Sequence, residues 1–63
     1  MAKLMIATCT LEAKNGVWTI ELTKDLKTGL YMVTRNGVLV GIRTTDVDDA
    51  HREFAEEILS YKL

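Results

Sequence analysis

The chain has 63 residues and a mass of 7.1 kDa, which is enough for one small domain over residues 1–63. So short a chain buries only about 60% of the surface that its unfolded form exposes, and such domains usually need a disulfide, a metal or a partner chain. A single cysteine excludes an internal disulfide, and one cysteine beside one histidine is too few ligands for a structural zinc site. With 48% hydrophobic residues, 27% charged residues and a net charge of −1, the composition excludes a disordered chain and leaves a partner chain as the expected support.

The first two expected strands cover residues 3–13 and 17–24, joined at the dipeptide Asn15-Gly16. Asn-Gly favours a two-residue type I′ turn, because both central residues of that turn need positive φ. With the loop at this dipeptide, Cys9 lies opposite Leu22. The pattern therefore predicts a β-hairpin with a fixed register.

Side chains alternate between the two faces of a strand, so this register separates an apolar face from a polar one. A β-bulge in the first strand would reverse the facing of Met5 and Ala7, and this alternative stays open. The polar face is rich in threonine and charged residues. The apolar face, expected to meet the core, holds Met5, Ala7, Cys9, Leu11, Ala13, Trp18, Ile20 and Leu22.

A second hairpin is expected over residues 30–35 and 38–44, around Asn36-Gly37, with Gly29 in a left-handed conformation before it. Its register places Tyr31 opposite Ile42, with Gly41 as a second candidate bulge. Unlike the first hairpin, it is apolar on both faces. The face turned away from the core holds Leu30, Met32, Thr34, Leu39, Gly41 and Arg43.

The last element is a helix over residues 46–60, with Thr45 as the expected N-cap and Asp48 at the third helical position. The fold class is therefore α+β: a four-stranded antiparallel β-meander, made of two hairpins, packed on one C-terminal α-helix (β-β-β-β-α). Helical spacing predicts an acidic strip on the outward side, made of Asp49, Glu53, Glu56 and Glu57. The inward face is expected to hold Val47, Ala50, His51, Phe54, Ala55, Ile58 and Tyr61.

The sequence gives no support for catalysis. Cys9 and His51 are the only candidates for a nucleophile and base, and no third group supplies an orienting residue or an oxyanion site. The acidic run that starts at Asp46 lacks the glycine and the closing loop of a calcium site, so it is interpreted as the start of a helix. We therefore expect a protein that is not an enzyme, with no catalytic residue, no cofactor and no metal.

Nucleic acid is the alternative partner. Residues 31–41, followed by Thr45 and the Ala50/Phe54 pair, resemble the sheet and helix of plant ethylene-response-factor domains and integrase arm-binding domains. The β-meander with a helix also resembles single-stranded-DNA-binding modules of the PUR and Whirly types. These resemblances imply a regulator that binds single- or double-stranded DNA with its sheet, and we infer no family membership from them. The cations available for phosphate contacts are Lys14, Lys24, Lys27, Arg35 and Arg43.

The doubly apolar second hairpin favours a protein partner instead. Monomers seldom leave contiguous apolar patches uncovered, and 63 residues provide little covering material. We therefore expect a binding module that forms a homodimer or docks on another protein. No segment is long and apolar enough to be a signal peptide or a membrane span, so a cytoplasmic protein is expected, of a size that fits a bacterial or phage origin. The candidate interface residues are Val17, Leu30, Met32, Leu39 and Arg43.

Overall fold

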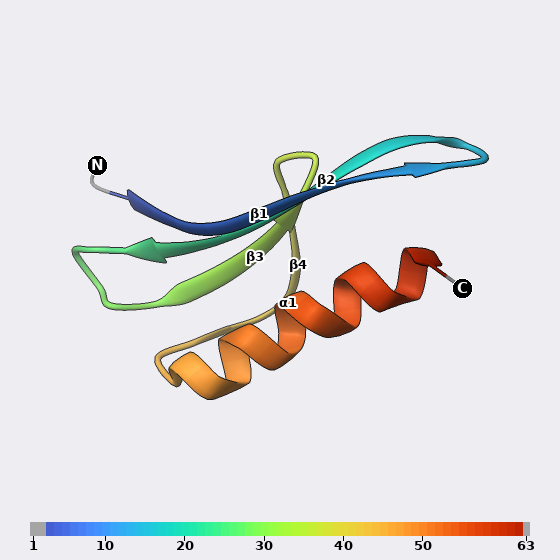
Figure 1. Ribbon diagram of the computed structural model, residues 1–63. Helices are drawn as coiled ribbons and strands as arrows, with labels where there is room; N and C mark the ends of the chain where they lie inside the picture. Colours follow the sequence, from blue (N-terminus) through green and yellow to red (C-terminus); the bar gives the residue numbers. More distant parts are fainter. Residues whose placement is uncertain (1–2, 63) are drawn as a thin grey trace.

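The computed structural model describes residues 3–62, with the side chains of residues 42, 61 and 62 left out. Four strands are followed by one helix (Figure 1). The sheet order is β1-β2-β3-β4, each neighbouring pair is antiparallel, and α1 packs on the sheet, which confirms the expected α+β meander. The elements are β1 (Lys3–Ala13), β2 (Gly16–Asp25), β3 (Tyr31–Arg35), β4 (Val38–Thr44) and α1 (Val47–Lys62).

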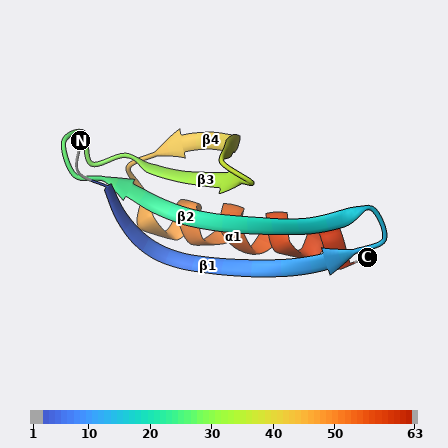
Figure 2. The ribbon, with the colours of Figure 1, turned by 90° about the horizontal axis from the view of Figure 1, so that it is seen from above.

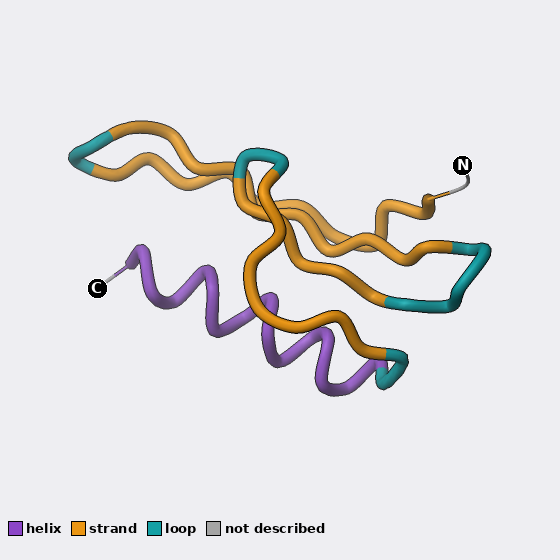
Figure 3. Tube along the Cα trace, turned by 180° about the vertical axis from the view of Figure 1, so that it is seen from behind, coloured by secondary structure: helices purple, strands orange, loops and turns teal. Residues whose placement is uncertain are grey.

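The molecule has two layers, with α1 lying under one face of the sheet (Figures 1 and 2). The β1–β2 hairpin is longer than the β3–β4 hairpin, and its tip extends toward the C-terminal end of α1 (Figure 3). The Cα positions accordingly span 37 × 22 × 15 Å. Within residues 3–62, α1 is neither long nor apolar enough to cross a bilayer.

The turn of the first hairpin differs from the expected one. Ala13 is opposite Gly16, so the two loop residues are Lys14 and Asn15, and Cys9 lies opposite Ile20 instead of Leu22. Among the described residues, positive φ outside glycine occurs only at Asn36, so Asn15 does not adopt the type I′ conformation. The register has slipped by two residues, and a slip of two leaves each side chain on its expected face because the strand period is two.

A β-bulge does reverse part of the expected facing in β1. The register shifts between Met5 and Ala7, which makes Ile6 the extra residue. Ala7 is opposite Leu22 and stays on the helix face, whereas Met5 is opposite Thr23 on the polar face. The prediction that Met5 faces the core is therefore wrong, and the extra residue of the bulge is the physical reason.

The second hairpin forms at the expected turn. Asn36 and Gly37 have φ of 50° and 85°, as a type I′ turn requires, and Arg35 lies opposite Val38. Beyond Val33 the register shifts at Gly41, whose φ is 73°. Tyr31 consequently lies opposite Thr44 and not opposite residue 42. The glycine adopts the left-handed conformation that a bulge of this kind demands.

Asn36 also links the two hairpins. Its side-chain Oδ1 accepts a hydrogen bond from the Thr19 backbone N–H at 2.8 Å, and its own N–H donates to the Thr19 carbonyl at 2.9 Å. Its Nδ2 donates to the carbonyl of Val17 at 3.4 Å. The turn of the second hairpin therefore extends the hydrogen bonding of β2 beyond the last residue of β3.

The helix is capped by Asp46 and not by Thr45. The Asp46 Oδ1 accepts hydrogen bonds from the N–H groups of Asp48 at 2.9 Å and Asp49 at 3.3 Å. The Asp46 N–H in turn donates to the Thr44 hydroxyl at 3.0 Å. The expected cap was one residue too early because Thr45 and Asp46 are both good N-cap residues and neither is distinguished by the sequence pattern.

The core lies between α1 and the middle of β2 and β3. Within the described part of the chain, the buried residues are Ile20, Leu22, Val33 and Ala50, with Phe54 and Ile58 of α1 packed against them. The helix is rotated relative to the predicted orientation: His51 and Ala55 are exposed, and Val47 is 43% exposed. The prediction that these three residues face the core is wrong, and Tyr61 lies outside the described side chains.

Candidate interaction surfaces

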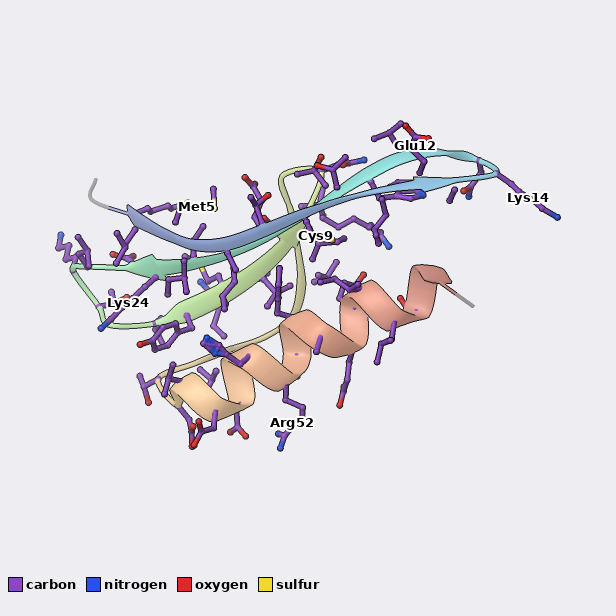
Figure 4. All side chains as sticks on the ribbon, viewed as in Figure 1. Met5, Cys9, Glu12, Lys14, Lys24 and Arg52 are labelled. Carbon is purple, nitrogen blue, oxygen red and sulfur yellow. The ribbon has the colours of Figure 1, made fainter. Side chains whose placement is uncertain are left out.

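The outer face of the sheet, which is the face turned away from α1, is mainly polar. Its cross-strand rows follow from the register: Thr8 with Glu21 and Thr34, Thr10 with Thr19, and Glu12 with Val17. Figure 4 shows the Glu12 side chain on this face and Cys9 on the opposite side, toward the helix. The four threonines and two glutamates in these rows make this part of the outer face hydrophilic.

Three apolar side chains interrupt the outer face at one end. Met5 is opposite Thr23, which is itself opposite Met32, so the two methionines flank one threonine. Leu39 is opposite Thr34, which makes it a diagonal neighbour of Met32, at about 7–8 Å between Cα atoms. Met5 is 50% exposed and Leu39 is 43% exposed. We call Met5, Met32 and Leu39 the outer patch.

The other candidate interface residues do not extend the outer patch. Val17 is 56% exposed but lies at the tip of the first hairpin, separated from Met32 by rows of threonine. Leu30 is half-buried and precedes β3, where its carbonyl accepts a hydrogen bond from the Asp25 N–H. Arg43 is exposed on the edge strand β4. The structure thus brings Met32 and Leu39 together, adds Met5, and leaves Val17 apart.

The five candidate cations for nucleic-acid binding do not form one patch. Lys14 and Lys27 lie in different turns, after β1 and after β2. Lys24 and Arg35 are opposite Tyr31 and Ile20, which places them on the helix face of the sheet. On the outer face, between the β1 bulge and the tip of the first hairpin, the charged side chains are those of Glu12 and Glu21.

The two cations of the helix face contact aromatic rings. The Lys24 ammonium lies 5.3 Å from the centre of the Tyr31 ring, and the Arg35 guanidinium lies 5.6 Å from the centre of the Trp18 ring. Arg35 also lies 3.9 Å from the Glu57 carboxylate of α1. In these contacts the charged groups of Lys24 and Arg35 lie over the aromatic rings, and their aliphatic parts cover the edge of the small core.

The predicted acidic strip does not point outward as a whole. Glu57 is directed to Arg35 of β3, and the Glu53 carboxylate lies against Gly41 of β4, where an added Cβ would overlap it. Asp49 accepts a hydrogen bond from Arg52 at 2.7 Å, which leaves Glu56 as the exposed acid of the four. The rotation of α1 explains this difference, since it turns Glu53 and Glu57 toward the sheet.

The two residues considered for catalysis, Cys9 and His51, lie on different elements of the fold. Cys9 is half-buried on the helix face of β1, and His51 is exposed on α1. Among the described residues there is no group of three acidic, histidine or cysteine side chains that could hold a metal ion. These residues also enclose no pocket.

One feature of the structure was missed by the sequence interpretation. β1 is an edge strand, and residues 4–11 within it carry no charge. This run is visible in the sequence, and edge strands without charges are prone to pair with another chain. The predicted β-meander already places the first strand at an edge of the sheet, so the sequence carried this signal in full.

No protein-family model, curated protein or solved structure matches the chain.

Proposed function

We propose that the protein is a small non-enzymatic binding module that associates with a second copy of itself through the outer face of its second hairpin. The observation that supports this best is the outer patch of Met5, Met32 and Leu39 on a face that is mainly hydrophilic. Contiguous exposed apolar side chains on a small domain are typical of interaction surfaces. We propose a cytoplasmic location, where the Cys9 thiol would stay reduced.

The limited burial within one chain supports association. Among the side chains that the structure describes, the buried ones are those of Ile20, Leu22, Val33 and Ala50, and one of these four is only an alanine. Fully burying a large apolar side chain contributes about 1.5–3 kcal/mol, so covering the half-exposed residues of the outer patch would add about 1 kcal/mol for each. Two outer faces packed about 10 Å apart would bring the three side chains of each copy into contact with the other.

A protein surface fits the outer face better than nucleic acid does. The carboxylates of Glu12 and Glu21 stand on this face and would repel phosphates. The aromatic rings of Trp18 and Tyr31 lie on the helix face with Arg35 and Lys24, so they are not presented on the outer face for stacking with bases.

The substitution Leu39→Glu tests the proposal. It places a charge in the outer patch at a position that is already 43% exposed, so the fold should survive. The matched control is Val38→Glu, because Val38 is the adjacent residue, is 62% exposed and points to the other face. Sedimentation at micromolar concentration should show a smaller assembly for Leu39→Glu than for the wild type and for Val38→Glu. Equal masses for all three proteins, or a wild type at the 7.1 kDa of one chain, would refute the proposal.

A further inference from the structure

The free edge of β1 differs from the other edge of the sheet. In Figure 2 β1 forms one border of the sheet, and among the described residues no strand pairs with its outer edge. The opposite border is β4, which is shorter, is interrupted by the Gly41 bulge and carries Arg43. Short length, bulges and charges are the features that protect edge strands from pairing. Over residues 4–11 β1 has no charge and is protected only by its single bulge.

The hydrogen-bonding pattern shows which backbone groups of β1 face this edge. Thr19 of β2 uses its N–H and C=O for hydrogen bonds to Asn36. Its partner in β1 is Thr10, so Thr10 and Thr19 form a non-hydrogen-bonded pair, and the Thr10 N–H and C=O point to the free edge. By the alternation of an antiparallel ladder, the backbone groups of Thr8 and Glu12 point the same way.

The bulge preserves this pattern toward the start of the strand. Met5 is opposite Thr23 and Lys3 is opposite Asp25, whose N–H bonds the Leu30 carbonyl on the β3 side. Met5 and Lys3 are therefore also in non-hydrogen-bonded pairs with β2. One series of backbone groups, interrupted only at the bulge, is thus available along the edge. It consists of Lys3, Met5, Thr8, Thr10 and Glu12.

We propose that a second copy of the chain adds to this edge, with the two β1 strands antiparallel and centred on Thr8. Thr8 then pairs with Thr8 of the second copy, Thr10 with its Met5, and Glu12 with its Lys3. Every outward-facing backbone group of the series finds a partner in this register.

Charge complementarity selects this register. Lys3 and Glu12 are the charged residues that bound the uncharged run, and both lie on the outer face of the sheet. Centring on Thr8 places each of these residues opposite the other across the interface. A shift by two residues would place Lys3 opposite Lys14 in one direction and opposite Thr10 in the other, so it would lose the ion pairs or introduce repulsion.

The helix face supports the same arrangement. On this face Leu4, which is 51% exposed, lies opposite Leu11 of the second copy. Because Glu53 and Glu57 of α1 are directed to β4 and β3, the other flank of the helix lies toward β1. That flank is exposed in a single chain, and a neighbouring copy would bring its own flank beside it. It consists of His51, Ala55 and Leu59, the last 55% exposed.

This edge contact is independent of the outer patch. The two-fold axis that relates the copies is perpendicular to the joined sheet, so the outer face of each copy stays open. A protein that uses either contact alone forms a dimer, whereas both contacts together join such dimers into a larger assembly, which is a closed tetramer when the two axes intersect. The two proposals can therefore fail separately.

The first test is Thr10→Pro. Proline removes the outward N–H of Thr10 but no hydrogen bond to β2, and edge strands tolerate proline where the N–H faces solvent. Thr10→Val keeps the N–H and is the matched control. Sedimentation should show Thr10→Pro at half the mass of the wild type and of Thr10→Val, with an unchanged circular dichroism spectrum. A folded Thr10→Pro variant with the mass of the wild type would overturn the proposal, and Leu39→Glu reports on the outer patch separately.

The second test does not depend on that variant folding. In the proposed register Ala7 lies opposite Cys9 of the second copy in a non-hydrogen-bonded pair, where Cα atoms are about 4.5 Å apart and a disulfide can form. Under a mild oxidant, Ala7→Cys should give a covalent dimer of twice 7.1 kDa on a non-reducing gel. Leu11→Cys is the register control and should stay a single chain, as should the wild type. No covalent dimer for Ala7→Cys, or an equally efficient one for Leu11→Cys or the wild type, would refute the register centred on Thr8.

Discussion

Asn36 combines a conformational requirement with hydrogen bonds that no other residue type supplies together. Its φ of 50° is unfavourable for most side chains, and asparagine and glycine tolerate it best. Its amide also bonds the backbone of Thr19 and Val17 across the sheet. A residue chosen only for the turn would leave the Thr19 N–H without this acceptor.

Substitutions at Asn36 should separate these two roles. Asn36→Gly keeps the turn and loses the side-chain hydrogen bonds, which should lower the free energy of unfolding by about 1 kcal/mol. Asn36→Ala loses both and should cost about 1–2 kcal/mol more. Urea denaturation followed by circular dichroism measures both values. If Asn36→Ala and Asn36→Gly were equally stable, the positive φ would not contribute and this explanation would be wrong.

At the scale of single elements, the start of α1 depends on one carboxylate. Asp46 accepts hydrogen bonds from two N–H groups of the first turn, while its neighbour Thr45 has no such role among the hydrogen bonds of the described residues. Asp46→Ala should therefore lower the free energy of unfolding by about 1 kcal/mol, in the usual range for an N-cap. Thr45→Ala is the matched control and should change it by less than about 0.5 kcal/mol. Thermal denaturation of the two variants checks this, and a larger loss for Thr45→Ala would reinstate Thr45 as the cap.

The strands and turns also show how much of the fold can be predicted from the sequence. Turn dipeptides and alternation locate all four strands, and the Asn36-Gly37 turn forms as expected because both residues accept positive φ. The same reasoning misplaces the loop at Asn15, because a hairpin can close one pair earlier without moving any side chain to the other face. The bulge at Ile6 depends on how β1 fits against β2, which no local pattern encodes.

These shifts in register change which residues form the outer patch. Met32 and Leu39 were predicted on the outer face and lie there, in register with Thr23 and Thr34. Met5 joins them only because of the bulge. The orientation of α1 was not predictable either, because a short helix with apolar residues on a wide arc can pack in more than one rotation, and the contacts of Glu53 and Glu57 with the sheet decide between them.

At the scale of the whole molecule, the ratio of buried to exposed apolar residues connects stability to association. Among the described side chains, the large buried ones are those of Ile20, Leu22 and Val33, in a chain whose length already limits burial. The exposed large hydrophobic residues lie on both faces and at the β1 edge. They include Leu4, Met5, Ile6, Leu39 and Leu59. Association that covers some of these side chains would contribute to the stability of the folded chain itself.

The melting temperature should therefore depend on protein concentration. When folding is coupled to dimer formation, a tenfold rise in concentration stabilises the folded state by about 1.4 kcal/mol per dimer, which raises Tm by about 5 °C for two chains of this length. The double variant Thr10→Pro/Leu39→Glu removes both proposed contacts, so its Tm should be lower and independent of concentration. Calorimetry between about 10 μM and 1 mM measures the slope for the wild type, each single variant and the double variant. Because each contact is disrupted separately, the variant whose slope disappears identifies the contact that is coupled to folding, and a wild type with no slope would show that the chain is stable without a partner.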